Sequence, residues 1–218
     1  MTVCVAPAPG GAAPEAEVAT GPAPADPVAV QDPAHAAQPT ESPQICELVV
    51  GFVDLTGSTA LAARVPTPDY ARAMVRFRSI ATATVDRRGG RLVKVIGDGA
   101  LFLASDAPTG AAVAFALIAA CADHPELPAL RGGLAQGEVV LDGDDCFGLA
   151  VNLAAKSAAL ARPGSVVATR SVIDGLGDGA GCPPGQALPG GRLFDLPAFV
   201  ELFELDGPDG LEASRTTA

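Results

Sequence analysis

The chain has 218 residues, of which 49% are hydrophobic, and its formal net charge at pH 7 is −11. A chain of this length accommodates one domain with tails. Because acidic side chains outnumber basic ones, the sequence excludes a broad basic surface for nonspecific binding of nucleic acid.

The cysteines and the apolar segments indicate in which cellular compartment the protein is expected. The 5 cysteines are odd in number and contain no Cys-x-x-Cys pair, which favours free thiols over a disulfide framework or a zinc site. The longest apolar run, residues 111–121, is too short to cross a bilayer, and the first residues lack the pattern of a signal peptide. We therefore expect a cytoplasmic protein without a membrane segment.

Composition divides the chain into a folded segment and two tails. Residues 1–43 are rich in Ala, Pro and Gly and contain no aromatic side chain, so they cannot bury enough apolar surface to offset their chain entropy. We expect a disordered tail over residues 1–43, one domain over residues 44–206 and a flexible tail over residues 207–218.

The folded segment begins with an apolar run that ends in a carboxylate. Residues 45–53 have the length and apolarity of a buried central strand, and Asp54 follows directly. Gly57, Ser58 and Thr59 then lead into a short helix that ends at residue 64, and their backbone N–H groups would favour a phosphate. The alternative is that Asp54 only caps that helix.

A glycine-flanked aspartate lies in the next predicted hairpin. A long helix over residues 67–88 ends at a Gly-Gly pair, and two β-rich stretches follow at residues 92–96 and 100–103. The turn between them places Asp98 at its tip, with Lys94 four residues earlier on the first strand. An ordinary Asp-Gly turn has the same residues, so a function for Asp98 depends on a second carboxylate nearby.

The rest of the folded segment alternates between strands and helices. We expect an apolar helix over residues 107–123. Residues 130–141 form either a strand pair or one long bent strand, and residues 142–145 form an acidic turn. A helix, a strand, a short helix, a glycine-rich loop and a terminal hairpin follow over residues 149–161, 165–169, 171–176, 177–190 and 191–205. The first of these helices carries Asn152 and Lys156 one turn apart on the same face.

This order predicts an α+β fold with a ferredoxin-like βαββαβ core, followed by an extra C-terminal helix and hairpin. In that topology the end of the first strand lies beside the turn between the second and third strands. Asp54 and Asp98 would then face each other, and two such carboxylates form a site for Mg²⁺ or Mn²⁺.

Four blocks in this order resemble the catalytic domain of class III nucleotidyl cyclases. They are residues 52–59, 94–98, 131–139 and 148–154, which read FVDLTGST, KVIGD, RGGLAQGEV and GLAVNLA. The Gly-Ser-Thr form of the first block resembles bacterial members, and the resemblance covers residues 45–205. It implies the fold of that family and an adenylate or guanylate cyclase activity.

The resemblance implies a site with two metal ions. Asp54 and Asp98 match the two metal-binding aspartates of the family, and Leu55 falls where a backbone carbonyl joins the metal shell. Mg²⁺ or Mn²⁺ would occupy both positions. Arg131 matches an arginine that binds the triphosphate, and Arg192 would be a second such arginine.

The resemblance also implies ATP as the substrate. Lys94 and Asp145 match the pair that reads the purine: the lysine donates to adenine N1 and the carboxylate accepts from the N6 amine, whereas guanine presents O6 and N1–H there. Asn152 matches the residue that positions the ribose. In the family the metal ligands and the purine contacts come from different subunits, which implies a homodimer.

Two positions depart from the family pattern. Lys156 stands where the family has an arginine that stabilises charge on the α-phosphate, and Ala135 stands where a histidine is common. We therefore expect a slow adenylate cyclase that forms cyclic AMP and pyrophosphate from ATP. The alternatives are a catalytically impaired cyclase-like module that binds nucleotide or a partner, and a guanylate cyclase.

Overall fold

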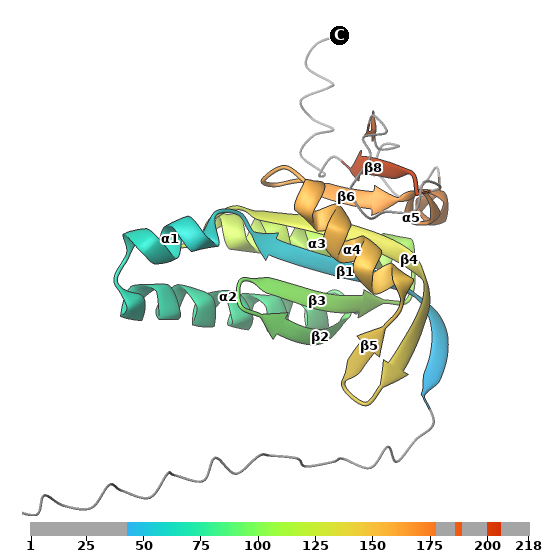
Figure 1. Ribbon diagram of the computed structural model, residues 1–218, viewed down its shortest axis with the longest axis horizontal. Helices are drawn as coiled ribbons and strands as arrows, with labels where there is room; N and C mark the ends of the chain where they lie inside the picture. Colours follow the sequence, from blue (N-terminus) through green and yellow to red (C-terminus); the bar gives the residue numbers. More distant parts are fainter. Residues whose placement is uncertain (1–42, 178–185, 189–199, 206–218) are drawn as a thin grey trace, which may run out of the picture. The chain divides into compact units, whose positions relative to one another are not determined.

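The computed structural model describes residues 43–177, 186–188 and 200–205 (Figure 1). The strands are β1 (Gln44–Leu55), β2 (Arg91–Ile96), β3 (Gly99–Ala104), β4 (Leu130–Asp142), β5 (Asp145–Phe147), β6 (Val166–Thr169), β7 (Gln186–Ala187) and β8 (Leu202–Leu205). The helices are α1 (Ser58–Arg64), α2 (Thr67–Arg87), α3 (Ala107–Ala122), α4 (Leu149–Leu160) and α5 (Arg170–Leu176).

The described strands form one mixed sheet in the order β2-β3-β1-β4-β6-β8-β7, and β5 pairs with the end of β4. The first four strands of this order are antiparallel neighbours, which is the arrangement of a ferredoxin-like core. The predicted α+β fold and the central position of the first strand are therefore confirmed. The segment over residues 130–141 is one long strand, and the short strands β5 and β7 were not predicted.

Helices cover both faces of the sheet. α2, α3 and α5 share one apolar cluster with β1 and β3, whereas α4 packs on the opposite face (Figure 1). α4 lies very close to β4 because Gly133 has no side chain: a Cβ atom there would overlap the backbone of α4 at Ala154 and Ala158. The extra helix after the ferredoxin-like core thus covers the face that the core helices leave open.

Several predictions fall on parts of the chain that the structure does not describe. These are residues 1–42 of the N-terminal tail, the C-terminal tail over residues 207–218, most of the glycine-rich loop and the first strand of the terminal hairpin. The second strand of that hairpin is β8, which pairs with β6 and β7. Within the described ranges, no helix has the length and apolarity needed to span a membrane.

Candidate active site

Two carboxylates from distant parts of the chain meet where β1 ends. Asp54 is in register with Gly99 at the start of β3, and the Leu55 N–H donates to the Asp98 carbonyl at 3.1 Å. Gly97 has a φ of 60°, which glycine adopts without strain, so the turn between β2 and β3 is tight. Asp54 and Asp98 are therefore neighbours, as the ferredoxin-like topology predicts.

The charge of Asp54 is opposed by burial and balanced by an arginine. Its Oδ2 accepts from Arg131 Nη2 at 2.9 Å, and the two side chains are 23% and 27% exposed. Burial raises the pKa of Asp54 and the neighbouring Asp98 acts in the same direction, while the hydrogen bond from Arg131 lowers it. The net effect is a pKa above the ordinary value. Asp98 in turn accepts a hydrogen bond from the Ser58 hydroxyl.

This donor set fits a hard divalent cation. Carboxylate oxygens are the ligands that Mg²⁺ and Mn²⁺ prefer, and a cation would offset both the burial of Asp54 and its repulsion by Asp98, which raise the pKa of Asp54. The described residues contain no group of three or more His, Cys, Asp or Glu side chains that could hold a metal. The Asp54–Asp98 pair is a candidate metal site because its carboxylates are neighbours and are of the type that these cations prefer.

A second cluster joins β2 to the hairpin of β4 and β5. Lys94 Nζ lies 2.6 Å from each carboxylate oxygen of Asp145, and the Cys146 N–H donates to Asp145 Oδ1 at 2.8 Å. The hydrogen bond from Lys94, followed by that from Cys146, holds the pKa of Asp145 below its usual value. The side chains of Lys94 and Asp145 are 39% and 38% exposed, so a ligand can reach both.

Both clusters lie on the face of the sheet that α4 covers. Phe52 packs in the apolar cluster under α4, and Asp54, two residues later on the same strand, points to the same face. Arg131 Nη1 reaches the end of α4, where it donates to the Ala159 carbonyl at 2.9 Å. On α4 itself, Asn152 is exposed and Lys156 is half-buried one turn later.

The remaining predicted site residues fall at the start of α1 or outside the described residues. Gly57 is the N-cap of α1, with a φ of 74°, and Gly57 and Thr59 are exposed. Ser58 is buried, and its hydroxyl is used by Asp98. Arg192 lies outside the described residues. A phosphate-binding role for these four residues stays a prediction.

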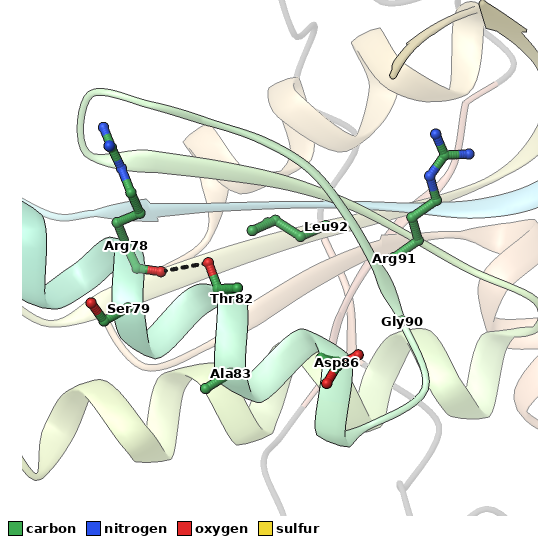
Figure 2. A pocket seen from close by; sticks show the side chains of 8 residues that line it. All are labelled: Arg78, Ser79, Thr82, Ala83, Asp86, Gly90, Arg91 and Leu92. Atoms are coloured by element: carbon green, nitrogen blue, oxygen red, sulfur yellow. Dashed lines mark hydrogen bonds between the residues drawn. The ribbon is translucent and has the colours of Figure 1, made fainter. Parts of the chain in front are cut away.

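A groove of about 650 Å³ lies elsewhere, between α2 and the start of β2 (Figure 2). Its lining contains none of the predicted site residues. The hydroxyls of Ser79 and Thr82 donate back to carbonyls of their own helix, at Val75 and Arg78. They therefore cannot donate to a ligand without losing these bonds, and the groove is not part of the candidate site.

Comparison with known sequences relates the chain to bacterial cyclases. No family model matches the chain. An adenylate cyclase of Streptomyces coelicolor is 36% identical over 129 residues, which is 59% of this chain and 34% of that protein. An adenylate cyclase of Streptomyces griseus is 32% identical over 158 residues, which is 72% of this chain and 40% of that protein. The matched part thus spans less than half the length of these relatives.

Comparison with solved structures extends over most of the domain. The catalytic core of a rhodopsin-guanylyl cyclase with converted specificity, in complex with ATPαS, matches with a TM-score of 0.67 at 20% identity, over 76% of this chain and 99% of that chain. The adenylyl cyclase CyaB from P. aeruginosa matches with a TM-score of 0.62 at 19% identity, over 76% and 96% of the two chains. The chain is thus similar in sequence to bacterial adenylate cyclases, and from β1 to β8 it has the fold of class III nucleotidyl cyclase catalytic domains.

Proposed function

We propose that this chain is an adenylate cyclase that converts ATP to 3′,5′-cyclic AMP and pyrophosphate at a site shared by two copies. One observation carries the proposal. A cyclase fold here presents, on one face of its sheet, both a carboxylate pair that fits divalent cations and a Lys94–Asp145 pair that fits an adenine edge. The relatives named adenylate cyclase support the same reaction.

The metal-binding half of the site would be formed by Asp54, Asp98 and the carbonyl of Leu55. Two Mg²⁺ or Mn²⁺ ions, when bound, would supply the Lewis acidity that favours ionisation of the 3′-hydroxyl and neutralises the leaving pyrophosphate. Arg131 pairs with Asp54 in this structure, so it is already placed beside the position where phosphate charge would be held. Arg192 and the start of α1 would add contacts to the triphosphate.

The other half of the site would bind the nucleoside and the reacting phosphate. Lys94 would donate to adenine N1 and Asp145 would accept from the N6 amine. Asn152 would orient the ribose so that its 3′-oxygen attacks the α-phosphorus in line. As that bond forms and the bond to pyrophosphate breaks, Lys156 would stabilise charge on the α-phosphate.

Base selection should depend on the Lys94–Asp145 pair. The double variant Lys94→Glu, Asp145→Cys exchanges the donor for an acceptor and removes the carboxylate. We expect kcat/KM for ATP to fall by at least about tenfold and the preference to shift towards GTP. The two rates are compared in one assay with both nucleotides. As a control, Asp142→Asn in the same turn should leave the preference for ATP over GTP unchanged. If the double variant keeps the full preference for ATP, Lys94 and Asp145 do not read the purine.

Lys156 should limit the rate. Lysine keeps the charge of the expected arginine but lacks its two fixed parallel donors, so Lys156→Arg should raise kcat about fivefold to tenfold with little change in KM. Lys156→Ala should lower kcat further. Steady-state kinetics with ATP measures both effects. If Lys156 acts only as a helix-surface residue, neither substitution will change kcat.

The proposal as a whole is tested with purified protein, ATP and Mn²⁺. An adenylate cyclase will form cyclic AMP and pyrophosphate in equal amounts. Faster formation of cyclic GMP from GTP would indicate a guanylate cyclase instead. Nucleotide binding without either cyclic product would indicate the impaired cyclase-like module.

A further inference from the structure

Two basic side chains of the edge strand β2 reach the same turn. Lys94 pairs with Asp145 at one side of the turn between β4 and β5. Arg91 reaches the turn itself, where its Nη2 donates to the Gly143 carbonyl at 3.0 Å and lies 3.9 Å from Asp144 Oδ1. The backbone of the turn that carries Asp145 is thus attached to β2 independently of Lys94.

A β-bulge puts the two basic side chains on one face. Residues three apart in a regular strand point to opposite faces. The register of β2 against β3 shifts between Leu92 and Lys94, and the extra residue brings Arg91 and Lys94 to the same side. Packing agrees with this, because Leu92 and Val95, also three apart, both pack in the cluster shared with α2 and α3.

The hairpin that carries Asp145 has little support of its own. β5 has three residues, and its described sheet partner is the end of β4 through three residue pairs. β1 pairs with the other edge of β4 only as far as Leu141, so residues 142–145 at the turn lack a third strand within the described part of the chain, and a two-stranded ribbon is only marginally stable in water. On β5 itself Cys146 is buried in the apolar cluster under α4, so the part of the hairpin that depends on contacts from β2 is the turn that precedes Asp145. Figure 2 shows the Arg91 side chain extending from the start of β2, away from Asp86 on α2.

We propose that Arg91 is a positioning residue for purine selection, which holds the β4–β5 turn so that Asp145 stays opposite Lys94 when a nucleotide binds. This inference rests on the proposed function. An adenine edge would replace the direct contact between Lys94 and Asp145, and the turn would then lose that link to β2. The hydrogen bond from Arg91 to Gly143 does not involve the purine, so it would still hold Asp145 in place.

Kinetics of Arg91→Ala tests the selection role. We expect KM for ATP to rise about fivefold, the ratio of kcat/KM for ATP to that for GTP to fall by a similar factor, and kcat to change less than about twofold. Arg91→Lys should keep part of the wild-type affinity for ATP and part of the wild-type preference for ATP over GTP, because lysine can still donate to the Gly143 carbonyl. Arg88→Ala, an exposed arginine just after α2, is the matched control. Equal KM and equal base preference in Arg91→Ala and Arg88→Ala would overturn the proposal.

Hydrogen exchange tests the anchor without reference to catalysis. In nucleotide-free protein, the amides of residues 143–147 should exchange faster in Arg91→Ala than in the wild type or in Arg88→Ala. Unchanged exchange would overturn the anchor even if the chain is an active cyclase. Faster exchange in a chain without any cyclase turnover would instead overturn the proposed function and the selection role, so the two failures are distinguishable.

Discussion

Asp54→Ala should lower the rate of cyclic AMP formation by at least about a thousandfold while the domain stays folded. The substitution removes one of the two carboxylates that would hold the metal ions, and Asp98 alone cannot replace it. The pKa of Asp54 is raised in the folded protein, which means that its ionised carboxylate destabilises the folded state at neutral pH. Replacing this carboxylate by alanine removes that cost, so the variant should fold. Arg131 loses its ion pair but keeps its hydrogen bond to the Ala159 carbonyl.

Two measurements separate a metal-binding role from a merely structural one. Mn²⁺ should raise the melting temperature of the wild type and have much less effect on Asp54→Ala, since a cation that binds only the folded state stabilises it. The control is Asp174→Ala, which removes an exposed carboxylate of α5 and should behave as the wild type. A variant Asp54→Ala that keeps more than about a tenth of the activity would contradict the metal assignment.

Two inactive variants should recover activity when they are mixed. If each site combines the metal ligands of one subunit with the nucleoside contacts of the other, Asp54→Ala and Asn152→Ala chains complement each other. Random exchange makes half of the dimers mixed, and each mixed dimer has one intact site of two, so about a quarter of the wild-type activity should return.

The matched control is a mixture of Asp54→Ala and Asp98→Ala chains. Both substitutions fall in the same half of the site, so every dimer in this mixture lacks an intact metal site. This mixture should stay inactive. If native mass spectrometry detects mixed dimers of Asp54→Ala with Asn152→Ala and no activity returns, the sites are not shared.

The parts of the site that local sequence determines could be predicted. Asp54 follows an apolar run of strand length, and Asp98 lies between glycines at a hairpin turn, so both positions follow from short-range patterns. The ferredoxin-like order of strands then places the two carboxylates together. The structure has this arrangement, in which Leu55 bonds directly to the Asp98 backbone.

The parts that depend on register could not be predicted. The bulge in β2 shifts the pairing of β2 with β3 by one residue. In a regular strand, Arg91 and Lys94 are three residues apart and would point to opposite faces of the sheet. β5 is too short and too polar at Asp145 to be recognised as a strand. The contact of Arg131 with Asp54 depends on the pairing of β1 with β4, which joins segments 77 residues apart.

The most direct test of the central claim is the initial rate of cyclic AMP formation from ATP and Mn²⁺ by wild-type protein, compared with Asp98→Asn prepared in the same way. Asparagine keeps the size of the side chain and can still accept the hydrogen bond from Ser58, so the fold should not change. We expect cyclic AMP and pyrophosphate in equal amounts from the wild type and neither product above background from Asp98→Asn. Equal rates in the two proteins, or no cyclic AMP from the wild type, would contradict the proposal.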